Sequence, residues 1–82
     1  IHLAYEEQLQ KIVDCFFVGI TQVYLLEIDK SAIAKDLRDE PPVGVEDDGA
    51  LYPHLYSPLS KKAVVRIIKL VADSSGALKV NL

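Results

Sequence analysis

A chain of 82 residues forms one domain with a small core, because a protein of this length buries only about 60% of its unfolded surface. Its net charge of −3, without a long basic stripe, argues against nucleic-acid binding. No apolar run approaches the roughly 20 residues of a membrane span, and the single Cys15 excludes an intramolecular disulfide. We therefore expect a soluble, cytoplasmic domain that has no membrane partner.

The first residues, Ile1-His2-Leu3, predict the end of a strand whose beginning lies outside the sequence. Because a translated chain starts with Met and this one contains none, we expect residues 1–82 to be a single domain and the C-terminal portion of a slightly longer one. Uncovered sheet edges and apolar surface would then favour self-association.

Residues 5–17 have the spacing of one amphipathic helix, and Gly19 is placed as its C-terminal stop. We expect its apolar stripe to pack on a sheet that contains Leu25, Ile28 and Val65. The stripe consists of Tyr5, Leu9, Ile12, Val13, Phe16 and Phe17. Truncating Phe16 to Ala should then cost about 3–5 kcal/mol. Cys15 lies off the stripe, with no base near it in sequence, so it is a poor candidate for a nucleophile.

The next segments predict a strand, a short helical stretch and a loop. Residues 22–28 are a nearly continuous apolar run typical of a central strand. After a turn, residues 31–37 fit one or two helical turns, whereas residues 39–49 are rich in Pro, Gly and acids and indicate a mobile loop. The acidic cluster at 46–48 lacks the spaced ligands of a calcium loop, so we interpret it as solvated.

The C-terminal third predicts further strands. Residues 64–71 are rich in β-branched side chains, which favours a strand, although positions 64, 67, 68 and 71 also fit a helix. A turn signal at 73–76 precedes the alternating residues 78–82, which predicts a terminal hairpin. The sum is an α+β domain: one main amphipathic helix and a small mixed or antiparallel sheet of four or five strands.

Residues 49–59 combine aromatic rings, a histidine and two prolines, and they are the strongest candidate for a functional segment. The prolines restrict the backbone, so Leu55 can face a core while His54 and Tyr56, two residues apart, share the opposite face. The two rings could form the wall of a ligand site. Alternatively, both are amphipathic side chains whose apolar bodies are buried and whose polar tips are satisfied by neighbours.

A signature runs through the chain: Ile1-His2-Leu3, Glu7-Gln8, Phe16-Phe17-x-Gly19, Leu25-Leu26-Glu27-Ile28-Asp29, Glu40, Tyr52-Pro53-His54-Leu55-Tyr56, Pro58-Leu59 and Ala63-Val64-Val65. From residue 1 to about residue 71 it resembles the family catalogued as domain of unknown function 952. The Pro-His-Leu-Tyr core is the most specific part. The chain departs from the family at Ala4, Asp39 and Ser57, where Ser, Trp and Gly are common.

The resemblance implies a fold similar to that of the ADP-ribosyltransferases, in which a split sheet binds a nicotinamide dinucleotide in a cleft. It also implies a further strand and helix before Ile1. It implies no reaction, because the family has no established activity and a shared fold leaves function to be argued from the site.

Two hypotheses from different classes follow. In the first, a small nucleotide-like ligand occupies a pocket around His2, Glu40, His54 and Tyr56. The histidines would hydrogen-bond a ribose or phosphate, Tyr56 would stack, and a loop would bring Glu40 towards His2 to steady positive charge on a ribose. In the second, the domain is a non-catalytic interaction or accessory module in which these groups satisfy one another. Metal binding by the two histidines and Glu40 has no ligand-spacing signal, and no cofactor is indicated.

Overall fold

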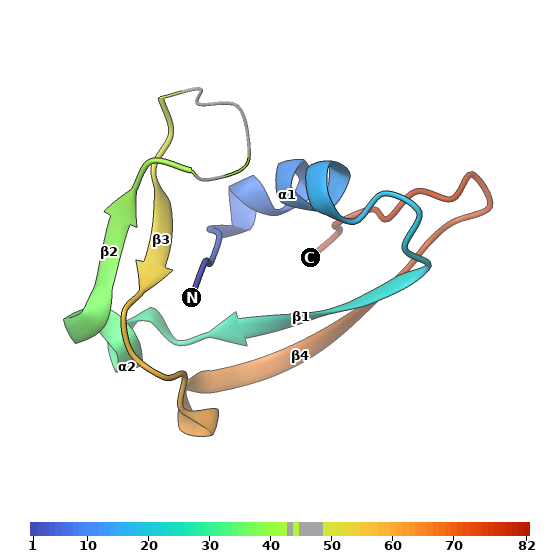
Figure 1. Ribbon diagram of the computed structural model, residues 1–82. Helices are drawn as coiled ribbons and strands as arrows, with labels where there is room; N and C mark the ends of the chain where they lie inside the picture. The colour runs from blue at the N-terminus through green and yellow to red at the C-terminus, as the bar shows by residue number, and fades with distance from the viewer. Residues whose placement is uncertain (43, 45–48) are drawn as a thin grey trace.

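The computed structural model describes residues 1–42, 44 and 49–82. The domain is α+β, as predicted, with two antiparallel two-stranded sheets, β1–β4 and β2–β3 (Figure 1). The elements are α1 (Leu9–Phe16), β1 (Gln22–Ile28), α2 (Lys30–Ile33), β2 (Leu37–Glu40), β3 (Tyr52–Leu55) and β4 (Val64–Val71), with 3-10 turns at Glu6–Gln8, Ala34–Asp36 and Lys61–Ala63. We expected one sheet of four or five strands. Across the described residues, four strands instead form two separate sheets.

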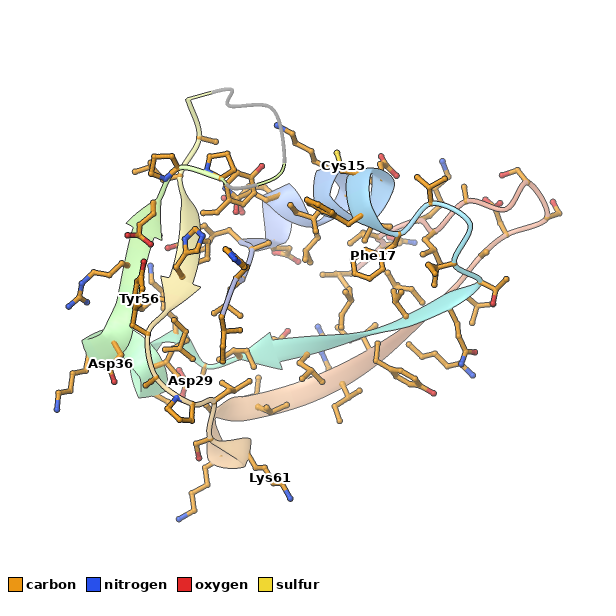
Figure 2. All side chains as sticks on the ribbon, viewed as in Figure 1. Cys15, Phe17, Asp29, Asp36, Tyr56 and Lys61 are labelled. Atoms are coloured by element: carbon orange, nitrogen blue, oxygen red, sulfur yellow. The ribbon has the colours of Figure 1, made fainter. Side chains whose placement is uncertain are left out.

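The amphipathic helix is confirmed, beginning with the 3-10 turn and continuing as α1. Gln8 fixes its start, because its side-chain oxygen accepts from the Tyr5 N–H at 2.9 Å and its amide nitrogen donates to the Leu51 carbonyl at 2.8 Å. Gly19 has φ +80°, the left-handed conformation expected of a residue that stops a helix. Cys15 is exposed on the side of α1 that faces away from β1 (Figure 2).

Only part of the predicted stripe packs on the sheet. Val13 is 4% exposed and shares a core cluster with Leu70 and Leu78, against which Leu25 packs. Leu25, Ile28 and Val65 do share this sheet, but the expectation that Phe16 is packed against it is wrong, because Phe16 is 51% exposed, and Val65 is 57% exposed on the sheet. Phe16 is the last residue of α1 and borders a cavity, so it is about half exposed instead of buried.

The predicted terminal hairpin does not form. The turn at 73–76 is present, with the Asp73 N–H donating to the Ala77 carbonyl at 2.9 Å, but residues 77–82 are not a strand. Gln10 replaces the missing strand partner: its amide nitrogen donates to the Leu78 carbonyl at 2.9 Å, and its oxygen accepts from the Val80 N–H at 2.7 Å. A helix side chain therefore holds the tail in place, with Leu78 buried beneath α1.

The sheet of β1 and β4 was predicted with the observed strand bounds, and the helical alternative for residues 64–71 is excluded. However, β1 is not a central strand, because β4 is its one partner among the described strands. The register places Leu26 opposite Ile67 and Tyr24 opposite Lys69. Directly opposed residues share a face, so these side chains and their exposed neighbours lie on the outer face of this sheet.

The second sheet contains a strand that the sequence did not predict. Residues 31–36 are helical, as expected, but residues 37–40 form β2 instead of the end of a helix and the start of a loop. β2 pairs with β3 over its whole length, from Leu37 opposite Leu55 to Glu40 opposite Tyr52. Leu55 is 1% exposed in a second core cluster with Ile33 and Ala63. The acidic cluster at 46–48 lies outside the described residues.

Candidate functional site

The candidate site is built on β3, whose four residues are all buried. One edge of β3 pairs with β2, and the other pairs with the N-terminal segment through the bridge between His2 and His54. The Leu3 N–H donates to the Pro53 carbonyl at 2.9 Å, and the Leu55 N–H donates to the Ile1 carbonyl at 2.8 Å. The prediction that residues 1–3 are extended and paired is thus confirmed (Figure 1).

Pro53 fits inside this strand because of where its nitrogen lies. The N–H and C=O groups of one strand residue point to the same side, and the Pro53 carbonyl faces the N-terminal segment. The missing N–H of Pro53 therefore costs the β2–β3 ladder no hydrogen bond. The proline fixes the local backbone while Leu55 faces the core and His54 faces the opposite side, as the sequence predicted.

His54 is 7% exposed and its ring is held by the backbone. Its Nδ1 lies 2.8 Å from the Tyr52 carbonyl oxygen. A carbonyl oxygen only accepts hydrogen bonds, so Nδ1 carries the proton and donates. In the neutral imidazole, Nε2 is then the acceptor nitrogen of the ring.

His2 lies beside His54 from the neighbouring chain segment. The two ring centroids are 4.7 Å apart and the rings are inclined by 78°, an edge-to-face contact. His2 is exposed, whereas His54 is buried. The pair of imidazoles, fifty-two residues apart in sequence, is brought together by the antiparallel bridge between the two backbones.

Glu40 and Tyr56 extend the cluster away from His2. Glu40 Oε1 accepts from the Tyr56 hydroxyl and lies 3.6 Å from His54 Nδ1. This carboxylate, as hydrogen-bond acceptor and then as a nearby charge, raises the pKa of Tyr56 above its usual range, so the phenol stays protonated. The expectation that a loop carries Glu40 towards His2 is wrong, because Glu40 belongs to β2 and contacts His54 and Tyr56.

A cavity of about 510 Å³ adjoins the two histidines. This histidine-pair cavity is lined by His2, Leu3, Ala4, Leu9, Ile12, Phe16, Phe17, Pro42, Tyr52 and His54. Its volume lies within the range of about 300–1,000 Å³ typical of small-molecule sites. Phe17 points from α1 towards β1 (Figure 2). Of the four predicted site residues, His2 and His54 line the cavity, whereas Glu40 and the 65% exposed Tyr56 do not.

Sequence reasoning missed the aromatic part of this lining. Phe16 and Phe17 were assigned to the helix core, yet both line the cavity. Two adjacent residues of a helix project about 100° apart, so one narrow stripe cannot bury both equally. The two adjacent Phe residues were therefore the signal that one of the rings lies outside the helix core. No group of three metal-ligating side chains occurs among residues 1–42, 44 and 49–82, and no helix in that part is long and apolar enough to cross a bilayer.

The fold and the histidine-pair cavity define a small α+β domain in which an extended N-terminal segment, β3 and α1 border a cavity beside an imidazole pair. The chain belongs to the DUF952 family, described as protein of unknown function, whose model matches residues 1–67. It is similar to the crystal structure of protein CC0527 from Caulobacter crescentus, with 34% identity and a TM-score of 0.80 over 96% of this chain. A double-mutant structure of that protein gives the same values. This chain spans 66% of the length of CC0527. No curated protein matches it.

Proposed function

We propose that this domain binds a small nucleotide-like molecule whose planar ring enters the histidine-pair cavity. The observation that carries the proposal is a buried histidine with a fixed tautomer in the wall of a largely apolar cavity. A cavity of this kind suits a ligand with an apolar planar body and a few polar atoms. Phe16 and Phe17 offer rings for stacking, and they replace Tyr56 in the stacking role.

The proposal is for binding rather than ADP-ribosyl transfer. In that reaction a carboxylate would steady positive charge on the ribose, and Glu40 is the carboxylate of the cluster, 3.6 Å from Nδ1 of His54. Its Oε1 is engaged by the Tyr56 hydroxyl, and Glu40 is not part of the cavity lining. A likeness to the ADP-ribosyltransferase fold is part of this proposal, because such a fold would place a nicotinamide or adenine nucleotide in a comparable cleft.

The test is a titration with AMP and nicotinamide mononucleotide, followed by NMR of the two imidazoles. We expect saturable shifts of the His2 and His54 ring signals, with binding lost in His54→Ala. Tyr56→Phe is the matched control, because it alters the same cluster outside the cavity and should bind normally. His2→Ala tests the same wall at an exposed position, in case His54→Ala unfolds. Ring signals that stay unmoved at saturating nucleotide would overturn the proposal.

A second candidate function is self-association through the outer face of the β1–β4 sheet. This face carries large apolar side chains that are about half exposed or more: Tyr24, Leu26, Val65, Ile67 and Val71. Contiguous apolar surface on a small domain marks an interaction site. In the described part of the chain, β1 and β4 each have one edge without a strand partner, which adds hydrogen-bonding groups to the same surface.

A further inference from the structure

The histidine-pair cavity also indicates which part of a ligand it receives. Resting on the proposed function, we infer that it takes a ring that carries no negative charge and donates an N–H or O–H hydrogen bond to Nε2 of His54, and that phosphate groups stay outside it. The inference depends on the tautomer of His54, on the charges around it and on the lining of the cavity.

The first step is the direction of the hydrogen bond. Nδ1 of His54 donates to the Tyr52 carbonyl at 2.8 Å, so the backbone of β3 fixes the proton on that nitrogen. Nε2 is the nitrogen left to a ligand, and in the neutral ring it accepts. A ligand that displaces water from this point but presents only acceptors would leave Nε2 without a hydrogen bond, which costs affinity.

The second step is the charge of the ligand. None of the described residues that line the cavity is Lys or Arg, the side chains that usually hold phosphate. Two groups near His54 carry negative charge or partial negative charge: the Glu40 carboxylate at 3.6 Å from Nδ1, and the Tyr52 carbonyl. An anion beside the His54 ring would be repelled by this nearby carboxylate, and no Lys or Arg among the described lining residues would offset the repulsion. A neutral heterocycle avoids that cost.

The third step is the shape of the site. The remaining described lining is apolar or aromatic, with Phe16 and Phe17 from the C-terminal end of α1 and the residue after it, and Leu3 and Ala4 from the N-terminal segment. This surface suits the flat body of a heterocycle, with a single polar edge directed at the imidazoles. The cavity thus recognises the ring end of a nucleotide-like molecule.

The experiment compares two probes of nearly equal size, N-methylnicotinamide and methyl nicotinate. The amide has one N–H where the ester has an oxygen, so only the amide can donate to Nε2. We expect the amide to bind about tenfold more tightly, which is the usual effect of one lost hydrogen bond of this kind. In His54→Ala the two probes should bind equally, because the acceptor has been removed. Long-range ¹⁵N couplings of His54 should show a protonated Nδ1 in the free protein.

The outcomes separate this inference from the proposed function. If the two probes bind equally to the unmodified protein and both require His54, the cavity is a ligand site, but the inference that the ligand must donate a hydrogen bond to Nε2 is wrong. If inorganic phosphate shifts the His54 ring signals at lower concentration than the amide, the exclusion of anions is wrong. An Nε2-protonated tautomer in the free protein also overturns the inference. If neither probe nor any nucleotide binds, the inference and the proposed function fail together.

Discussion

At the scale of single residues, burial separates side chains that the sequence pattern treats alike. Leu55 and Phe16 both occupy apolar positions in the signature, but Leu55 is 1% exposed and Phe16 is 51% exposed. Leu55 fills a core cluster beneath β3, whereas Phe16 borders the histidine-pair cavity. Leu55 should therefore contribute to the stability of the fold, and Phe16 should contribute to ligand binding.

We expect Leu55→Ala to lower the free energy of unfolding by about 2–5 kcal/mol, because it removes a fully buried side chain and leaves a void. Phe16→Ala should cost about 1 kcal/mol or less, because the ring already contacts water. Chemical denaturation measures both. Leu51→Ala is the matched control, since Leu51 is 50% exposed. If Phe16→Ala lowers the free energy of unfolding as much as Leu55→Ala does, Phe16 is a core residue and this assignment is wrong.

At the scale of elements, side chains form hydrogen bonds to backbone groups that have no partner within a helix or strand. Gln8 ties the start of the helix to the segment before β3, and Gln10 takes the place of a strand partner for the C-terminal tail. Asp73 closes the turn after β4: its Oδ1 accepts from the Ser75 hydroxyl, from the Ser75 N–H at 2.9 Å and from the Ala77 N–H at 3.1 Å.

These donors, the Ser75 hydroxyl first and the two backbone N–H groups after it, lower the pKa of Asp73. A lowered pKa in the folded state means that the ionised form stabilises the fold. This stabilisation is complete above the usual Asp pKa of about 3.9 and is lost as pH falls through the folded value. NMR titration of the Asp73 carboxyl group should show this, and Ser75→Ala should raise the pKa. Equal pKa values in the two proteins would assign no role to the Ser75 hydroxyl.

At the scale of the whole molecule, two small sheets do not cover each other. α1 and the C-terminal tail pack on one face of β1–β4, and the outer face keeps its apolar side chains exposed (Figure 1). The consequence is a molecule with one polar cluster around the buried His54 of β3 and one open apolar surface. The two proposed functions occupy these separate places.

We expect the protein to self-associate as its concentration rises, and Ile67→Lys to weaken the association at least tenfold. Ile67 is 63% exposed and lies opposite Leu26 near the middle of the sheet, where a buried charge would be unpaired. Sedimentation velocity over a range of concentrations measures the effect. Ser74→Lys is the control, because it adds the same charge in an exposed turn. A wild-type protein that is monomeric at every concentration would exclude this surface as a self-association site.

The sequence alone determined the elements whose signals are local. The bounds of β1 and β4, the helix that ends before Gly19, the turn at 73–76 and the placement of Leu55 opposite to His54 all follow from periodicity, β-branching and the conformational limits of Pro and Gly. The sequence suggested His2, His54, Glu40 and Tyr56 as one site only as a hypothesis, because no local signal joins residues so far apart in the chain. His2, His54, Glu40 and Tyr56 are linked by successive contacts.

Only the tertiary structure decided the rest. β2 contains three charged residues and has little strand propensity of its own, so it is a strand because β3 supplies its partner. The terminal residues alternate like a strand, yet Gln10, from another part of the chain, satisfies their backbone. The lining of the cavity likewise depends on where α1 lies relative to β3. These outcomes are set by contacts between residues distant in sequence, and a local pattern carries no record of such partners.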